Sequence, residues 1–313
     1  MAEDQVGSQQ ADELSAAVAA VKKNPTDPAR WDRMDELLET IQRPEVASPV
    51  FAHVLRKRPS LELVTEVGQR GVRFYETWYG EDSKELAAWL EAVLEADPSA
   101  QWAFERLTIA HTVGERWGAL LDAYDRAVET ADQTSRRMRL LEEAAQVAKD
   151  FANSPDRAIG YMLRLHALDP DNVGLAAGLE RLLERQERWA DLVGLWQSRL
   201  NMQAPKQAQQ TRVRMANVYL DKLARYPDAL AQAKHVLAEA TDNEAAHEVI
   251  ERVLGAAQAD AAERREALQV LRQRHLDAHK PEVVVRVLEQ ALGYAQDQER
   301  RARRKYSRFY KGR

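Results

Sequence analysis

Apolar residues recur at three- and four-residue spacing along most of the chain, as at Leu192, Leu195 and Trp196. This spacing gathers them on one face of an α-helix, because a helix completes a turn every 3.6 residues. The β-branched and aromatic runs typical of strands are missing. Helix-breaking dipeptides separate the periodic segments at Asn24-Pro25, Asp97-Pro98, Asp169-Pro170 and Thr241-Asp242. The pattern therefore predicts a series of amphipathic helices joined by short turns.

The same pattern returns at an interval of 72 residues. Residues 114–128 match residues 186–200, with Trp117 at the position of Trp189. A second set, residues 82–100, 154–172 and 226–244, matches at the same interval. Each interval divides into sub-units of about 34 and 38 residues, and each sub-unit is predicted to be a helix pair. The second helices of these pairs are expected to begin near Pro44, Ser83, Trp117, Pro155, Trp189 and Pro227.

One stretch, residues 28–59, carries an early aromatic residue, a small residue, a later aromatic and a closing proline. These positions are Trp31, Ala47, Phe51, Val54 and Pro59. The stretch resembles the tetratricopeptide repeat (TPR), a helix–turn–helix of about 34 residues. The resemblance implies an all-α, TPR-like solenoid of stacked antiparallel helix pairs over residues 10–295, between a disordered N-terminus at 1–9 and a basic C-terminal helix or tail at 296–313.

The chain departs from the TPR pattern in three ways. Leucine replaces the small residue of the second helix at Leu86, Leu120, Leu192 and Leu230. Inserted residues around 131–135 and 202–210 break the strict period. Beyond residue 242 the register slips, since the next matching element, residues 280–292, lies 54 residues after Pro227. We therefore expect about one helix to be lost or remodelled between Gly255 and Glu263.

One helix pair cannot bury its apolar stripe alone, so neighbouring pairs must stack into a continuous core. The seven tryptophans are predicted to be the large packing residues of that stack: Trp31, Trp78, Trp89, Trp102, Trp117, Trp189 and Trp196.

Composition and charge argue against several classes of function and of site. The net charge of −5 argues against a surface built throughout for nucleic acid. The absence of cysteine excludes disulfides, thiolate metal sites and cysteine nucleophiles. The first residues lack the apolar segment of a signal peptide, and no apolar run approaches the ~20 residues that span a bilayer. We expect a protein of the cytoplasm, and the Ala, Arg, Leu and Glu bias is typical of a GC-rich bacterial genome.

The sequence gives little support for catalytic or metal-binding groups. Neither a P-loop nor a dinucleotide-binding glycine motif occurs. His275 and His279 have the spacing of two zinc ligands on one helix face, but Leu276 stands where a metalloprotease needs glutamate, and no third ligand is evident. The alternative is two half-exposed helix histidines. The sequence predicts no enzyme activity, no metal and no cofactor.

The cluster at residues 74–79 is a candidate partner surface, because tyrosine and tryptophan are enriched at binding hot spots. In the TPR geometry Tyr75, Trp78 and Tyr79 would face the concave groove; alternatively, they pack against the neighbouring first helix. The resemblance places further residues on that inner face: Val147, Phe151, Arg181, Arg185, Tyr219 and Lys222. It thus implies a scaffold or adaptor that holds an acidic or amphipathic segment of a partner protein or peptide.

The C-terminal segment 298–313 has eight Lys and Arg residues against one Glu, with aromatic residues between them. Three interpretations stay open. It is a helix that caps the solenoid, a patch that binds nucleic acid or anionic lipid, or a segment that docks on an acidic protein. The basic residues concerned are Arg300, Arg301, Arg303, Arg304, Lys305 and Arg308. A regulatory or targeting segment of a larger assembly is a further possibility.

Overall fold

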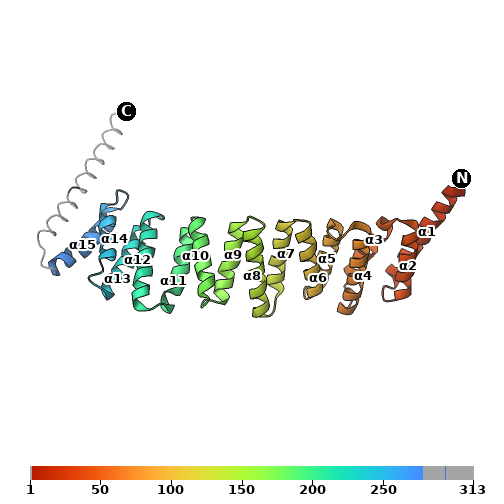
Figure 1. The fold of residues 1–313 in the computed structure, drawn as a ribbon, viewed down its shortest axis with the longest axis horizontal. Coiled ribbons are helices and arrows are strands. Elements are labelled where there is room, and N and C mark those ends of the chain that lie inside the picture. The colour runs from red at the N-terminus through yellow and green to blue at the C-terminus, as the bar shows by residue number, and fades with distance from the viewer. Residues whose placement is uncertain (1, 278–292, 294–313) are drawn as a thin grey trace, which may run out of the picture. The chain divides into compact units, whose positions relative to one another are not determined.

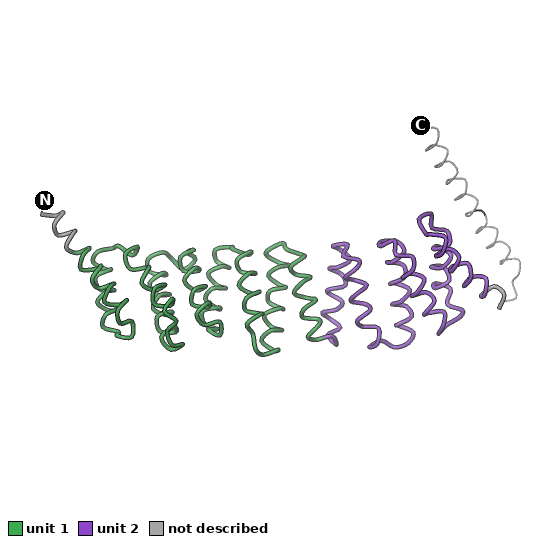
Figure 2. Tube along the Cα trace, turned by 180° about the vertical axis from the view of Figure 1, so that it is seen from behind, with its two compact units in different colours: residues 1–169 green, residues 170–313 purple. Residues whose placement is uncertain are grey.

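The computed structural model describes residues 2–277 and residue 293, with side chains described for residues 10–273 and 293. Within this part of the chain all regular structure is helical, and the chain divides into two compact units, residues 1–169 and 170–313 (Figure 2). The helices of unit 1 are α1 (Ala2–Lys23), α2 (Pro28–Ile41), α3 (Pro44–Arg56), α4 (Leu61–Tyr79), α5 (Lys84–Ala96), α6 (Gln101–Val113), α7 (Trp117–Thr130), α8 (Thr134–Asp150) and α9 (Pro155–Leu168). Those of unit 2 are α10 (Val173–Arg185), α11 (Trp189–Arg199), the short 3₁₀ helix η1 (Leu200–Met202), α12 (Pro205–Asp221), α13 (Tyr226–Glu239), α14 (Glu244–Gly255) and α15 (Ala261–Asp277).

Helices pack on their neighbours in chain order within each unit. In unit 1, α4 packs on α5, α5 on α6, α7 on α8 and α8 on α9, and α3 also reaches α5, the second helix of the next pair (Figure 1). In unit 2, α12 packs on α13 and α13 on α14, while α12 reaches α14 and α13 reaches α15. First helices thus contact first helices, and second helices contact second helices. The predicted all-α, TPR-like solenoid of stacked helix pairs is confirmed.

The predicted starts of the second helices agree with the structure to within one residue. α3 and α9 begin at Pro44 and Pro155, because proline lacks the N–H that the first turn of a helix leaves unpaired anyway. α5 begins after Ser83, whose hydroxyl accepts the N–H of Leu86 at 3.1 Å. Asn172 and Asn243 cap α10 and α14 in the same way. Local sequence signals therefore set the helix boundaries.

No helix is lost after Gly255. α14 ends at Gly255, residues 256–260 form a short turn, and α15 begins at Ala261, where the spacing of the earlier pairs places the next second helix. The sequence signal for this helix is weak because α15 has neither a starting proline nor a large aromatic residue, and among its residues up to Gln273 only Ala267 and Leu271 are buried. The later match at residues 280–292 lies outside the described residues.

The N-terminal segment also differs from expectation. α1 begins at Ala2, so residues 2–9 are helical where the sequence predicts disorder. This segment contains several good helix formers and no proline. Farther along the same helix, Leu14, Val18 and Val21 are buried, and α1 packs on α2 and α3. The helix is thus anchored at its C-terminal half.

Aromatic residues fill the core of the first repeats. Trp31 and Phe51 are almost fully buried, and their ring centroids lie 5.2 Å apart. Phe51 also contacts Trp89, at 5.5 Å. Of the seven tryptophans, Trp31, Trp89 and Trp196 are buried, whereas the other four are half-buried. The predicted packing role therefore applies fully to three of them.

The turns inside the helix pairs share one backbone feature. Each of the six turns between α2 and α13 that join a first helix to its second helix contains a residue with positive φ. These residues are Gln42 (58°), Gly80 (99°), Glu115 (51°), Asn153 (45°), Glu187 (53°) and Ala224 (51°). The left-handed conformation reverses the chain quickly enough for the second helix to fold back.

Candidate functional site

The predicted ring Tyr75 packs inside the array. Its ring stacks on Trp89 at 5.9 Å and lies 5.9 Å from Phe51, and its hydroxyl donates to the carbonyl of Ser48 at 3.4 Å. Burial raises the pKa of the Tyr75 phenol. These partners belong to the second helices α3 and α5. The ring is thus half-buried against second helices, and a role for it in contacting a partner stays a prediction.

The neighbouring candidates are more accessible. Tyr79 is half-buried with its ring 5.8 Å from that of Tyr75, and burial raises its pKa as well. Trp78 is also half-buried. A role for these rings in contacting a partner stays a prediction.

Three of the remaining predicted contacts, Phe151, Tyr219 and Lys222, have ring–ring or cation–ring partners. In unit 1, Phe151 is 57% exposed and stacks on Trp117 at 5.2 Å, whereas Val147 is half-buried. In unit 2, Arg225 lies over the Tyr219 ring at 5.1 Å and Lys222 over the Trp189 ring at 4.9 Å. Arg181 and Arg185 are exposed on α10.

Other predictions lie beyond the described side chains. The six basic residues Arg300, Arg301, Arg303, Arg304, Lys305 and Arg308 belong to this group, as do His275 and His279. Among the side chains that the structure describes, no three His, Asp or Glu residues are grouped to hold a metal ion. None of the described helices is long and apolar enough to cross a membrane.

Unit 1 contains two adjacent cavities where second helices end and first helices begin. We call them together the turn groove. One, the apolar chamber, has a volume of about 540 Å³. Its apolar lining includes Ala88, Ala92, Leu94, Phe104, Ala123 and Ala127, and charged residues also line it, namely Glu91, Glu95, Arg126, Glu129 and Arg136. The other, the basic chamber, has a volume of about 400 Å³ and is lined by Gln101, Asp132, Gln133, Ser135, Arg136 and Arg139. Arg136 lines both, so it forms their common wall.

The apolar chamber exists because small side chains recur where α5 faces α7. Ala88 and Ala92 are four residues apart on α5, and Ala123 and Ala127 are four apart on α7. Residues at this spacing share one helix face. Alanine on both faces leaves space between the two helices.

Phe104 closes the floor of the apolar chamber. It is 7% exposed and meets the Tyr124 ring edge-on at 5.3 Å. The Tyr124 hydroxyl donates to the Glu143 carboxylate at 3.2 Å. Burial, and the nearby Glu143 carboxylate, raise the pKa of this phenol well above its usual range. Tyr124 is therefore a neutral hydrogen-bond donor that fixes α7 to α8.

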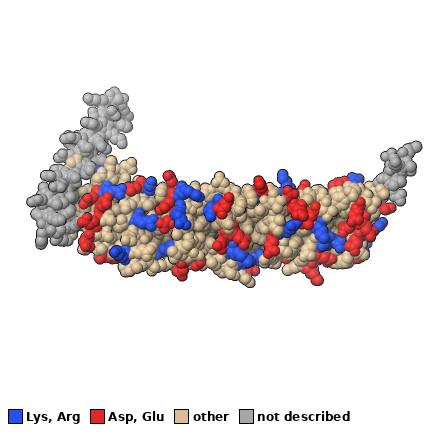
Figure 3. Space-filling model, in the orientation of Figure 1, with Lys and Arg blue, Asp and Glu red and all other residues tan. Residues whose placement is uncertain are grey.

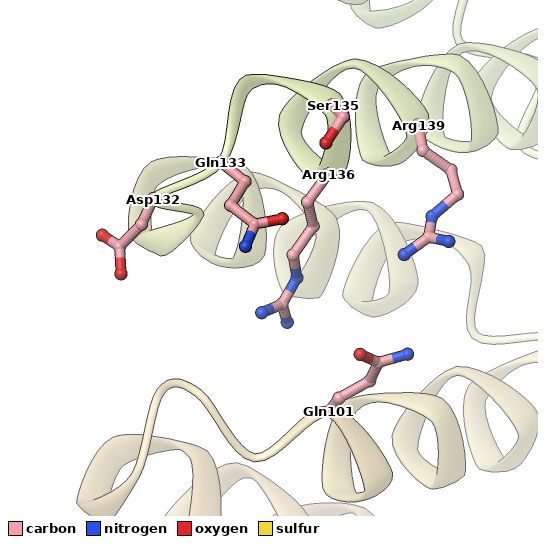
Figure 4. Close-up of a pocket in the computed structure, with 6 residues that line it drawn as sticks. All are labelled: Gln101, Asp132, Gln133, Ser135, Arg136 and Arg139. Atoms are coloured by element: carbon pink, nitrogen blue, oxygen red, sulfur yellow. The ribbon is translucent and has the colours of Figure 1, made fainter.

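The basic chamber gathers side chains from the start of α8 over the start of α6. Figure 4 shows Arg136 and Arg139 extending from α8 toward the gap above Gln101, while Asp132 points away from it. Arg136 is half-buried and Arg139 is exposed. Neither guanidinium forms an ion pair with a residue in the described part of the chain.

Arginines on the preceding first helices of unit 1 form ion pairs. Arg70 of α4 pairs with Asp32 and Asp35 of α2, at 3.1 and 2.7 Å. Arg106 of α6 likewise donates to Glu76 of α4 at 2.6 Å. On α8 the position of Arg70, 72 residues on, is Glu142, while Arg136 and Arg139 lie nearer the start of the helix and have no such carboxylate among the described residues. Elsewhere both signs of charge are interspersed over the face seen in Figure 3.

The sequence analysis missed the turn groove, although two of its signals are visible in the sequence. The alanines recur at helical spacing on α5 and α7. The inserted residues 131–135 lie at the start of α8, where Gln133, Ser135 and Arg136 line the basic chamber. The sequence alone does not show that Arg136 has no acidic partner among the described residues. That depends on which residues of α6 face α8.

Comparison with known proteins gives structural similarity only. No family model matches the chain, and no curated protein matches it. Among solved structures it is similar to YrrB, described as a TPR protein with an unusual peptide-binding site, at 14% identity over 75% of this chain and 98% of that one, with a TM-score of 0.27.

Two further structures are similar to a comparable degree. A tetratricopeptide repeat protein from Parabacteroides merdae is 14% identical over 76% of this chain and 90% of that one, with a TM-score of 0.24. The P58(IPK) TPR domain is 16% identical over 94% and 97%, with a TM-score of 0.26. Because TM-scores this low do not establish a shared fold, the assignment of the fold rests on the helix packing within each unit. On that packing, this chain is a divergent TPR-like helical-repeat protein.

Proposed function

We propose that this chain is a non-enzymatic scaffold or adaptor that holds a segment of a partner protein, with the turn groove of unit 1 as the main contact. The observation that carries the proposal is an apolar chamber adjoining two arginines without ion-pair partners. The cytoplasmic location expected from the sequence is part of this proposal. The half-exposed Trp78 and exposed Phe151 are proposed as additional contacts.

The chemistry of the turn groove favours recognition over catalysis. Its two chambers have the volume of ordinary ligand pockets, which are about 300–1,000 Å³. Their lining combines apolar surface with a few fixed polar groups and includes no histidine. Apolar surface contributes affinity because binding removes it from contact with water. The polar groups fix the orientation of the bound segment.

Site-specific photo-crosslinking tests this function. A benzophenone amino acid at Ala88, an exposed residue of the apolar chamber, is expected to form a discrete adduct with one protein in cells that naturally produce the chain. The matched control carries the same amino acid at Gly160, an exposed position on α9 with open space around it. This control is expected to form no such adduct.

A blocking variant makes the test specific to the groove. Ala92→Trp adds a large side chain to the half-buried lining of the apolar chamber and is expected to abolish the Ala88 adduct. Circular dichroism and thermal unfolding check that the variant stays folded. An Ala88 adduct that persists in folded Ala92→Trp, or the absence of any adduct, contradicts the proposal.

A further inference from the structure

The geometry points to a partner segment that carries an aspartate or glutamate side chain. We propose that this carboxylate binds between Arg136 and Arg139 in the basic chamber, while apolar side chains next to it in the partner fill the apolar chamber. This inference rests on the proposed function, and it adds the chemical class of the partner segment.

The first argument is the charge on Arg136. Its side chain is half-buried and, like Arg139, lacks an acidic partner among the described residues. Removing a charge from water is unfavourable unless an opposite charge compensates for it. Other arginines on first helices of unit 1, Arg70 of α4 and Arg106 of α6, have that compensation from the preceding first helix. A carboxylate from outside the chain would supply it for Arg136 and Arg139.

The second argument is the set of neutral groups around the two guanidiniums. The Ser135 hydroxyl and the Gln133 and Gln101 amides line the same chamber. The Ser135 hydroxyl and the Gln133 amide contain hydrogen-bond donors, and the Gln101 amide, which already donates one N–H to Glu105 at 2.7 Å, has a second. A planar carboxylate accepts several such bonds at once, and arginine can bind it with two parallel bonds. Asp132, the one acidic residue of this lining, points away from the gap (Figure 4).

The third argument is the position of the apolar chamber. Because Arg136 forms the wall shared by both chambers, a residue bound at the arginines has neighbours that lie over Phe104 and the alanines of α5 and α7. An amphipathic segment, with an acidic residue beside apolar ones, matches this sequence of surfaces. Glu95 and Glu129 line the apolar chamber and repel a second acidic residue there. They therefore favour one direction of binding.

Nucleic acid fits this surface less well than a protein carboxylate. Binding to a phosphate backbone depends on several cations that follow the strand. Here Arg136 and Arg139 stand beside a chamber lined by Glu91, Glu95 and Glu129, in which Arg126 is paired with Glu91, and the chain has a net charge of −5. The observations thus favour an acidic protein segment.

Display of random peptides on the intact chain tests the inference without knowledge of the natural partner. Selected peptides are expected to share an Asp or Glu next to apolar residues. A synthetic copy of the strongest binder is then compared with a twin in which Asn or Gln replaces the acid, using fluorescence anisotropy. We expect the twin to bind at least about tenfold more weakly, since hydrogen bonds to charged groups are worth more than neutral ones.

The protein variants make the electrostatic contact specific. The double variant Arg136→Gln, Arg139→Gln is expected to bind the acidic peptide and its neutral twin equally. The control Arg164→Gln removes an exposed arginine from α9 and is expected to bind like wild type. In the reversed variant Arg136→Glu, Arg139→Glu, a lysine-bearing twin is expected to regain binding, which a merely unfolded protein does not allow.

The outcomes separate the inference from the function on which it rests. Selected peptides without acidic enrichment, or an acidic peptide that binds the Gln double variant as well as wild type, overturn the inference. A labelled single-stranded oligonucleotide that binds wild type and is lost in the Gln double variant also overturns it, in favour of phosphate. Selected peptides that still bind folded Ala92→Trp overturn the proposed use of the groove.

Discussion

At the scale of single residues, the turns inside the helix pairs hold the left-handed conformation with ordinary side chains. Of the six positions with positive φ in the turns inside the pairs from α2–α3 to α12–α13, five are Gln, Glu, Asn or Ala, and only Gly80 is glycine. A left-handed residue with a Cβ atom costs about 1–2 kcal/mol through contact with its following carbonyl. The array therefore carries a small backbone strain in nearly every one of these turns.

Relief of that strain is measurable at Ala224, whose φ is 51° and whose side chain is exposed. We expect Ala224→Gly to raise the free energy of unfolding by about 0.5–1 kcal/mol, because the removed strain exceeds the entropy that glycine adds to the unfolded chain. Urea denaturation measures the change. The matched control Ala231→Gly, at an exposed helical position of α13, is expected to lower stability by about 1 kcal/mol. A loss of stability in both variants contradicts the argument.

These left-handed positions are also the residues that the sequence predicts least well. Prolines and capping residues announce the helix starts, since proline fixes φ and serine or asparagine accepts an N–H. Glu115, Glu187 and Ala224 carry no comparable signal for positive φ. Their conformation follows from the need to fold the second helix back on the first.

At the scale of helices, two glycines of α4 allow tryptophans of neighbouring helices to approach closely. The Trp89 indole N–H of α5 donates to the carbonyl of Gly68 at 3.0 Å. A Cβ atom on Gly71 would overlap the Trp89 ring, and one on Gly68 would lie 2.8 Å from Trp102. Close packing against these tryptophans is therefore the role of both glycines.

A pair of substitutions distinguishes packing glycines from unused ones. Gly71→Ala is expected to lower the free energy of unfolding by about 1–3 kcal/mol, because Trp89 must shift to admit the methyl group. Gly160→Ala in α9 has open space around it and is expected to raise stability by up to about 1 kcal/mol through helix propensity. Thermal unfolding followed by circular dichroism checks both. Changes of the same sign contradict the packing role.

Element by element, the sequence predicts helices well where residue type and period agree. Prolines, capping residues and large apolar residues mark the second helices from α3 to α13 in the sequence. α15 lacks these signals, because among its described side chains, residues 261–273, only two are buried and most of the others are exposed or charged. A helix at the edge of an array needs less apolar surface, so its pattern is weaker.

At the scale of the whole molecule, the repeat predicts the fold but not the candidate site. The family geometry directs Tyr75 to an inner face, yet its ring packs between Phe51 and Trp89. The turn groove instead depends on the small size of the alanines that line the apolar chamber. It also depends on Arg136 and Arg139 forming no ion pair with the described residues. Neither property is visible until helices far apart in sequence are placed side by side.

The contacts of unit 1 are confined to neighbouring helices, which makes its stability local. In such an array, stability is approximately a sum of repeat and nearest-neighbour contributions, so one damaged repeat weakens its neighbours first. Phe51 of α3 is fully buried and contacts Trp31, Phe74 and Trp89. Leu141 of α8 is equally buried, toward the other end of the same unit.

Native-state hydrogen exchange tests whether the stability of unit 1 is local. Phe51→Ala, which costs about 3–5 kcal/mol in a packed core, is expected to reduce amide protection in α2–α5 and to leave α8 and α9 close to wild type. Leu141→Ala, at about 2–5 kcal/mol, is expected to do the reverse, with losses in α7–α9 and intact protection in α2. Each variant thus controls for the other. An equal loss across α2–α9 in both contradicts nearest-neighbour stability, since it means that unit 1 unfolds as one cooperative block.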